Sequence, residues 1–170
     1  MSIIYDFRQY LKYVFIIVAV FIAIVSVVTS NSLIKKLAEE ERQKMEVWSM
    51  ATRAFMDDDI SPAEADQEVR QKQERRMELY SSIITGNTSI PVIICDEEGN
   101  IQQHRNVNTP EKDEDAFMKK KVKEYSTKNP PITIEIGENY RQYLYYDDSI
   151  ILKRLLIYPY AELIVMFVFI

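Results

Sequence analysis

The segment VFIIVAVFIAIVSVV (Val14–Val28) lies within a stretch of 22 residues without charge, from Tyr13 to Ile34. As an α-helix rising about 1.5 Å per residue, this stretch is long enough to cross a hydrocarbon core of about 30 Å. A cleaved signal peptide is the alternative, although the apolar run is at the long end of the roughly 7 to 15 residues usual there. We expect residues 13–30 to form a transmembrane helix that follows a short tail, residues 1–12.

The charged residues are concentrated in the middle of the 170-residue chain. Residues 31–154 contain 43 of the 47 charged residues, whereas both ends of the chain are strongly apolar. Such ends would expose more apolar surface than a soluble monomer tolerates, so this distribution excludes a single soluble domain. The middle carries 19 basic and 24 acidic residues, and its acidic balance argues against a nucleic-acid partner.

The composition also excludes several kinds of site. The chain has one cysteine, Cys95, and one histidine, His104, whereas a structural zinc site takes about four such ligands and a disulfide takes two cysteines. No glycine-rich phosphate loop, HExxH motif or nucleophile elbow occurs. We therefore expect no catalytic residue, metal or cofactor in this sequence. We interpret Cys95 as a small core residue, His104 as a surface residue and the acidic run Asp57–Asp59 as solvated.

The C-terminal segment LIVMFVFI (Leu163–Ile170) is apolar, but its eight residues are less than half of a spanning helix of about 20 residues. We expect residues 150–170 to be an exit helix and the start of a second transmembrane helix that the end of the chain cuts short. A short interfacial anchor is the alternative. The positive charges leave the orientation open, because Lys and Arg flank the first apolar segment on both sides.

Residues 31–60 are predicted to continue the first helix beyond the membrane as a signalling helix, since they contain good helix formers and neither Gly nor Pro. A heptad frame places Trp48 and Phe55 at core positions, together with the charged Glu41 and Lys44. The two charges weaken a coiled coil. A dimeric coiled coil and packing of this helix against its own domain therefore both remain open.

A second helix is predicted to begin at Ser61-Pro62, which offer an N-cap and a proline at the first helical position, and to stop at Gly86. Its apolar residues Met77, Tyr80 and Ile84 form a short stripe near its end. This pattern predicts a solvated first half and a buried second half.

Four segments have the composition of β-strands and are arranged as two hairpins with turn residues between them. They are Val92–Cys95, Ile101–Arg105, Ile132–Ile136 and Tyr140–Tyr146. A third helix is predicted to begin at Thr109-Pro110, between the hairpins. This order suits one antiparallel sheet covered by helices, so residues 61–149 are predicted to fold as a small α+β domain.

The last predicted strand places Arg141, Tyr143 and Tyr145 on one side, because alternate residues of a strand share a face. A face of this composition can line a wet cavity that takes an anionic or aromatic small molecule. We assign Arg105 to the same lining. The alternative is that these four residues pack within the domain or lie in solvent.

The segment YYDDSIILKRL (Tyr145–Leu155), followed by Tyr158-Pro159-Tyr160, resembles a pattern of the membrane-bound sensor histidine kinases of Bacteroidetes type. In those kinases the pattern YYxDSxLLxxL, with a later YPY, leads into the second membrane helix. Asp147 stands where the pattern often has Gly, and Glu162 adds an acid beside the span. The segment IICDEEGNIQQHRN (Ile93–Asn106) resembles the first hairpin of extracytoplasmic PAS-like or Cache-like sensory domains.

This resemblance implies the homodimeric sensory input region of a two-component sensor histidine kinase in the bacterial inner membrane. Residues 1–12 would then be cytoplasmic, and the domain of residues 61–149 would be extracytoplasmic and would receive an unidentified ligand or protein. The ATP- and Mg-dependent kinase domain and the response regulator would lie outside these residues. The residues expected to transmit the signal are Trp48, Phe55, Asp148, Ser149, Leu152 and Pro159.

Two other classes of function share this architecture. One is a membrane-anchored structural or adaptor protein with a small extracytoplasmic interaction domain. The other is the front of a chemoreceptor or of a nucleotide cyclase.

Overall fold

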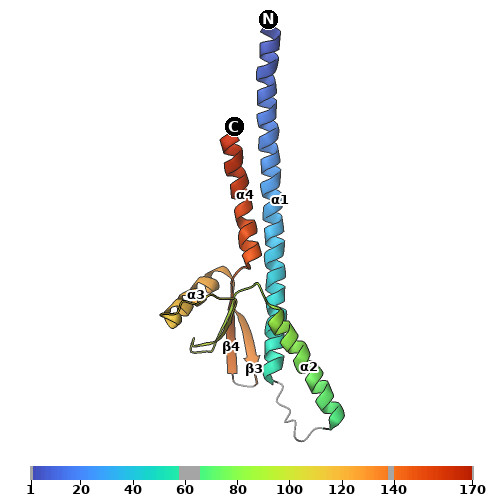
Figure 1. Ribbon diagram of the computed structural model, residues 1–170, viewed down its shortest axis with the longest axis vertical. Helices are drawn as coiled ribbons and strands as arrows, with labels where there is room; N and C mark the ends of the chain where they lie inside the picture. The colour runs from blue at the N-terminus through green and yellow to red at the C-terminus, as the bar shows by residue number, and fades with distance from the viewer. Residues whose placement is uncertain (1, 58–65, 138–139, 170) are drawn as a thin grey trace. The chain divides into compact units, whose positions relative to one another are not determined.

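The computed structural model describes residues 2–57, 66–137 and 140–169. Within these residues the fold is α+β, with four helices and one four-stranded antiparallel sheet (Figure 1). The predicted fold class is confirmed to this extent. The chain divides into two units, Met1–Glu39 with Ile151–Ile170, and Glu40–Ile150.

The first unit consists of the first part of α1 (Ser2–Asp57) and nearly all of α4 (Ile150–Phe169). Among the described residues, α1 is the one helix that is long and apolar enough to cross a membrane. Large apolar side chains such as Phe15 and Phe21 are about two-thirds exposed, as expected of side chains that face lipid. The predicted helix at residues 150–170 is confirmed as a helix, and it contains Pro159.

The sheet lies in the second unit and has the strand order β2-β1-β4-β3. Its strands coincide with the four predicted segments, β1 (Val92–Cys95), β2 (Ile101–Arg105), β3 (Ile132–Ile136) and β4 (Tyr140–Tyr146). All the pairings are antiparallel, and β1 pairs with both β2 and β4. The two hairpins are therefore joined through their β1 and β4 strands.

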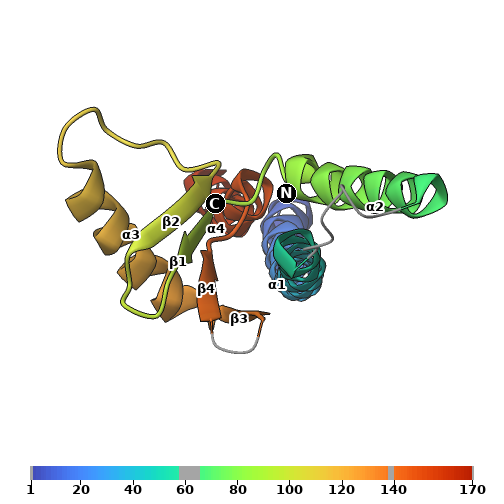
Figure 2. The same ribbon diagram turned by 90° about the horizontal axis from the view of Figure 1, so that it is seen from below.

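Each face of the sheet is covered by one helix (Figure 2). On one face, Val92, Ile94, Ile134 and Leu144 form a core with two side chains of α1. These two side chains are Met45 and Trp48. On the other face, Ile93 and Cys95 form a second core with Met118 and Tyr125 of α3 (Glu114–Lys128). The helix that carries the membrane-length segment thus contributes directly to the core of the sheet.

The face of α1 that packs on its own domain agrees only in part with the heptad frame. Its buried residues in this segment are Glu41, Met45, Trp48, Ser49, Ala51 and Thr52. Most of them are three or four residues apart and share one side of the helix, and Glu41 and Trp48 are also positions of the heptad frame. Lys44 is exposed, and Phe55 is 41% exposed. Of the two arrangements that the sequence left open, the structure therefore shows packing against the domain itself.

The second helix, α2 (Gln67–Gly86), has no fully buried residue. Its stripe residues Met77, Tyr80 and Ile84 are half-buried, so the predicted burial of its second half is only partial. The predicted start at Ser61-Pro62 lies outside the described residues. The same holds for most of the acidic run, of which Asp57 is described. The Asp57 carboxylate accepts a hydrogen bond from the Gly137 N–H at 3.0 Å.

The predicted start of the third helix at Thr109-Pro110 is wrong. The helix begins at Glu114, because the preceding Asp113 has a φ of 60° and lies in the left-handed region, where a right-handed helix cannot continue. The first helical hydrogen bond runs from the Phe117 N–H to the Asp113 carbonyl at 3.0 Å. Pro110 and Glu111 lie in the loop before the helix, whereas Glu114 and Asp115 form part of its first turn.

Candidate functional site

The chain leaves β4 through three residues that lie within the second unit, Asp147, Asp148 and Ser149. Asp147 and Ser149 are buried, which is unusual for a polar connection at the end of a strand. The Asp147 N–H donates a hydrogen bond to the Pro91 carbonyl at 3.2 Å. The connection is therefore attached to the start of β1, in the centre of the sheet. We call these three residues the exit connection.

A carboxylate of α1 contacts the exit connection. Glu41 is buried, and its Oε2 atom accepts a hydrogen bond from the Ser149 N–H at 2.9 Å. Ser149 directly precedes α4, where the N–H groups have no acceptor within the helix and where negative charge is favourable. Glu41 therefore satisfies a backbone donor at the point where the chain turns into α4. The contact joins α1 to the exit connection.

A lysine of α3 neutralises the buried aspartate of the exit connection. Lys128 Nζ lies 2.9 Å from Asp147 Oδ1, and the same oxygen accepts the Asp148 N–H at 2.9 Å. The hydrogen bond and charge of Asp147 raise the pKa of Lys128 above its ordinary value, against the opposing effect of burial. Burial, with the charges of Asp147 and Glu124, raises the pKa of Tyr125 to about 12. The end of α3 is thus coupled to the exit connection.

Trp48 connects α1 with the end of α2. Its indole Nε1–H donates a hydrogen bond to the Ile84 carbonyl at 3.1 Å, while its ring is buried against the sheet. Nearby on the sheet, burial raises the pKa of Tyr146, and the positive charge of Arg42 on α1 partly opposes this shift. The same segment of α1 therefore contacts the sheet, the end of α2 and the exit connection.

One polar group on the sheet face that packs against α1 is poorly satisfied. The Gln142 side chain is buried, and its Nε2 group donates to the Tyr140 hydroxyl at 3.3 Å. Among the residues that the structure describes, its Oε1 atom is buried without a hydrogen-bond partner. A buried acceptor in this state costs about 1–3 kcal/mol. This cost makes the packing on that face weaker than a fully apolar contact.

A groove of about 630 Å³ runs along α1 and the end of α2. Its volume is within the range of small-molecule sites, about 300–1,000 Å³. Apolar side chains contribute much of the lining, among them Met45, Val47, Trp48, Ile83 and Ile90. Polar side chains also contribute to the lining, including Lys44 and Asn87. The groove therefore adjoins the two α1 side chains that enter the core of the sheet.

The structure does not bring the four predicted ligand-binding residues together. Arg105 lies opposite Val92, which in turn lies opposite Tyr146, so Arg105 is on the face covered by α1. Arg141, Tyr143 and Tyr145 belong to the face covered by α3.

The contacts of the two arginines differ accordingly. Arg105 donates hydrogen bonds to the carbonyls of Asn87 and Thr85, both at 2.9 Å, and so binds the end of α2. Arg141 lies 3.8 Å from the exposed Glu135 carboxylate. Arg105 has a structural contact, and Arg141 a solvated one.

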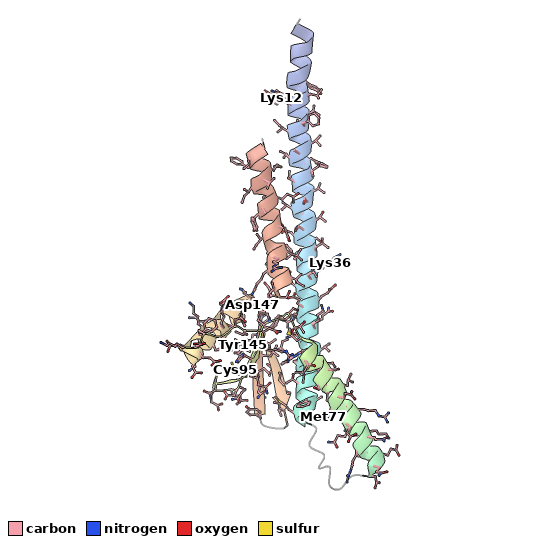
Figure 3. The ribbon with its side chains drawn as sticks, viewed as in Figure 1. Lys12, Lys36, Met77, Cys95, Tyr145 and Asp147 are labelled. Atoms are coloured by element: carbon pink, nitrogen blue, oxygen red, sulfur yellow. The ribbon has the colours of Figure 1, made fainter. Side chains whose placement is uncertain are left out.

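The other assigned residues on the α3 face have the predicted environments. Cys95 is buried beside Tyr145, and burial together with the Asp96 charge raises the pKa of its thiol to about 11 (Figure 3). A thiol with so high a pKa is protonated near neutral pH and is a poor nucleophile. His104 is exposed and lies 3.5 Å from Glu114. These positions agree with a core role for Cys95 and a surface role for His104.

The residues predicted to transmit a signal fall into three groups. Trp48, Asp148 and Ser149 belong to the contacts just described. Phe55 is exposed, whereas Leu152 and Pro159 are buried and belong to the first unit.

Sequence reasoning did not assign Glu41, Lys128 or Asp147 to the site. Glu41 stood out only as a charge within an apolar stripe. Lys128 and Asp147 are 19 residues apart and carry no shared pattern.

No protein-family model, curated protein or solved structure matches this chain.

Proposed function

We propose that this chain is the extracytoplasmic sensory input region of a two-component sensor histidine kinase, anchored in the bacterial inner membrane and acting as a homodimer. In this proposal α1 and α4 are the two membrane helices, and the sheet unit is a PAS-like or Cache-like sensory domain. A stimulus changes the packing of the sheet on α1 and thereby moves the exit connection. The kinase domain and the response regulator belong to the parts of the system beyond these residues.

One observation carries the proposal. The helix that contains the membrane-length segment also contributes Met45 and Trp48 to the core of the sheet, and its Glu41 contacts the exit connection. A change in the packing of the sheet therefore acts at the same time on α1 and on the exit connection that leads into α4. The adjoining groove supports this route, because a molecule bound there would touch Met45 and Trp48 directly. The unsatisfied oxygen of Gln142 lowers the cost of changing this packing.

Two states of the kinase require that the stimulus favour one of them energetically. In the proposed mechanism the Glu41–Ser149 contact is present in one state and broken or exchanged in the other. The contact then determines how far α1 and the exit connection each move when the sheet moves. Removing the Glu41 carboxylate is expected to change the balance between the two states, whereas removing an exposed neighbouring carboxylate is not.

The proposed role of the Glu41–Ser149 contact in signal transmission is tested with a fusion protein. Residues 1–170 are fused to the cytoplasmic half of a membrane histidine kinase whose output drives a reporter gene. We expect Glu41→Ala to change the basal output by at least about fivefold, which corresponds to the lower end of typical coupling energies. The matched control is Glu39→Ala, which removes an exposed carboxylate from the same helix. Equal outputs from the parent fusion and Glu41→Ala, at equal protein levels in the membrane, would contradict the proposed role of the Glu41–Ser149 contact.

Sidedness is tested separately with alkaline phosphatase, which is active only outside the cytoplasm, inserted after Asn108 in the exposed loop that follows β2. We expect strong enzyme activity from this fusion. A green fluorescent protein fused to the N-terminus is expected to fluoresce, because the proposed tail is cytoplasmic. An inactive phosphatase in a fusion of full length would overturn the proposed orientation.

A further inference from the structure

The first unit contains one acidic side chain in an otherwise apolar part of α4. From Leu155 to Phe169, Glu162 is the single charged residue. An ionisable side chain is costly in the hydrocarbon region of a membrane, and those found there face other helices or water-filled cavities rather than lipid. Glu162 is exposed on the surface of α4, so a hydrogen-bond donor on a neighbouring helix would reduce this cost.

The structure provides this donor. The Ser26 hydroxyl of α1 donates a hydrogen bond to Glu162 Oε2 at 2.6 Å, which joins residues 136 apart in the sequence. This distance is typical of a charge-assisted bond between a hydroxyl and a carboxylate, about 2.5–2.7 Å. Ser26 lies within the uncharged stretch, eight residues before Ile34, or about 12 Å along a helix. The bond thus joins the apolar segment of α1 to α4 well inside that segment.

The surroundings of this bond show that the two helices pack closely. α4 runs alongside the apolar part of α1, in the opposite direction (Figure 1). Ala23 is 4% exposed, although its neighbours in the sequence, residues 20–22 and 24–25, are exposed. A groove of about 330 Å³ between the helices is lined by apolar side chains, among them Ala23, Val27, Leu163 and Met166. A small buried residue at the contact allows two helices to approach closely, as is common in membranes.

The apolar contacts of such a pair do not define one alignment strongly, because lipid tails are as apolar as the side chains that they replace. A hydrogen bond between two particular positions does define one. A shift of α4 by one helical turn, about 5.4 Å, would separate the carboxylate from Ser26 and leave it among apolar groups. The Ser26–Glu162 bond therefore distinguishes one alignment of the pair from its neighbours.

We propose that Glu162 is a positioning residue that sets the register of α4 against α1 through its hydrogen bond with Ser26. The inference rests on the proposed function in one respect, namely that both helices lie in the bilayer. The inference assigns to Glu162 the role of stabilising one alignment of α4 against α1, among the alignments that would differ between the signalling states. The acceptor oxygen, rather than the charge, performs this role.

The experiment uses the full chain in membranes, in a Cys95→Ala background that removes the single native thiol. Ala23→Cys and Met166→Cys place a thiol on each helix at the apolar groove, and a short bismaleimide joins them within one chain. Trypsin then releases the two ends of the chain, which remain together on a gel only if they are cross-linked. The rate of cross-linking measures how often the helices occupy the described alignment.

We expect Glu162→Ala and Ser26→Ala each to lower this rate by about threefold to tenfold. This is the change in population that corresponds to the hydrogen-bond energies measured between membrane helices. Glu162→Gln keeps an acceptor oxygen and is expected to retain the parent rate. Ser32→Ala is the matched control, because it removes an exposed hydroxyl from the same helix. A parent rate in Glu162→Ala, or a loss in Glu162→Gln as large as in Glu162→Ala, would overturn the inference.

A second measurement separates this inference from the proposed function. Val165→Cys, alone in the Cys95→Ala background, is treated with a membrane-impermeant maleimide. If Val165→Cys is shielded but the parent pair does not cross-link, the helix pairing is not the one described and the inference fails alone. If Val165→Cys is labelled rapidly in intact membranes, α4 is not in the bilayer. The proposed function then fails together with the inference.

Discussion

Replacing Trp48 with alanine is expected to lower the free energy of unfolding of the sheet unit by about 3–5 kcal/mol. Trp48 is 4% exposed, lies in the core with Val92 and Leu144, and donates a hydrogen bond to the Ile84 carbonyl. Alanine leaves a cavity in this core and removes the donor. The effect is large because one side chain holds α1, the sheet and the end of α2 together.

The measurement is urea unfolding of the full chain in detergent, followed by the near-ultraviolet circular dichroism of the tyrosines. Tyrosine is the suitable probe because Trp48 is the single tryptophan of the chain and its signal disappears in the variant. The matched control is Phe55→Ala, an aromatic residue of the same helix that is 41% exposed, with an expected loss below about 1 kcal/mol. Similar losses in both variants would show that Trp48 has no special role in the core.

Replacing Lys128 with methionine is expected to lower the free energy of unfolding by about 2–3 kcal/mol. The variant removes the positive charge of Lys128 from the Asp147 carboxylate, whose side chain is 2% exposed. Breaking a fully buried pair in this way costs about 3–5 kcal/mol, and the lower value here reflects the 41% exposure of the Lys128 side chain. The measurement is the same unfolding experiment, applied to Lys128→Met, Asp147→Asn and the double variant.

The double-mutant cycle is expected to give a coupling free energy of about 1–2 kcal/mol between the two residues. Lys123→Met is the control, since it removes an exposed lysine from the same helix and is expected to change stability by less than about 0.5 kcal/mol. A coupling energy near zero would show that Lys128 does not stabilise the buried carboxylate.

The same pair gives the stability a defined pH dependence. The folded-state pKa of Lys128 is raised above its ordinary value of 10.5, so the contribution of Lys128 is fully present below pH 10.5. It is lost as the pH rises through the raised pKa, because the folded state then loses the favourable charge. The stability difference between the parent chain and Lys128→Met is therefore expected to be constant up to about pH 10 and to shrink above it. A difference that grows with pH would contradict this assignment.

The elements of the fold follow largely from patterns that act over a few residues. The apolar segment from Tyr13 to Ile34 specifies a long helix, and the turn residues between the strands specify two hairpins whose bounds agree with the structure. The start of α3 was mispredicted because a capping pattern shows only where a helix is favoured to begin. The left-handed conformation of Asp113 excludes a helix that runs through it.

The candidate site depended on choices that no local pattern contains. Alternation along each strand shows which residues share a face with Arg105 or with Arg141, but it does not relate the two strands. The pairing of β1 with β2 and with β4 places the two arginines on opposite faces of the sheet. The heptad frame placed Lys44 at a core position, whereas in the structure Lys44 is exposed and its neighbour Met45 is buried against the sheet.

The sequence by itself therefore determined the strands, the membrane-length segment and the presence of the helices, although not the start of α3, because backbone preferences and apolar periodicity act between neighbouring residues. The tertiary structure alone decided that Glu41 contacts Ser149, that Lys128 neutralises Asp147 and that Ser26 contacts Glu162. Each of these pairs joins residues far apart in the chain. Their partners are selected by which surfaces the packing of apolar side chains brings together, and that packing is a property of the assembled fold.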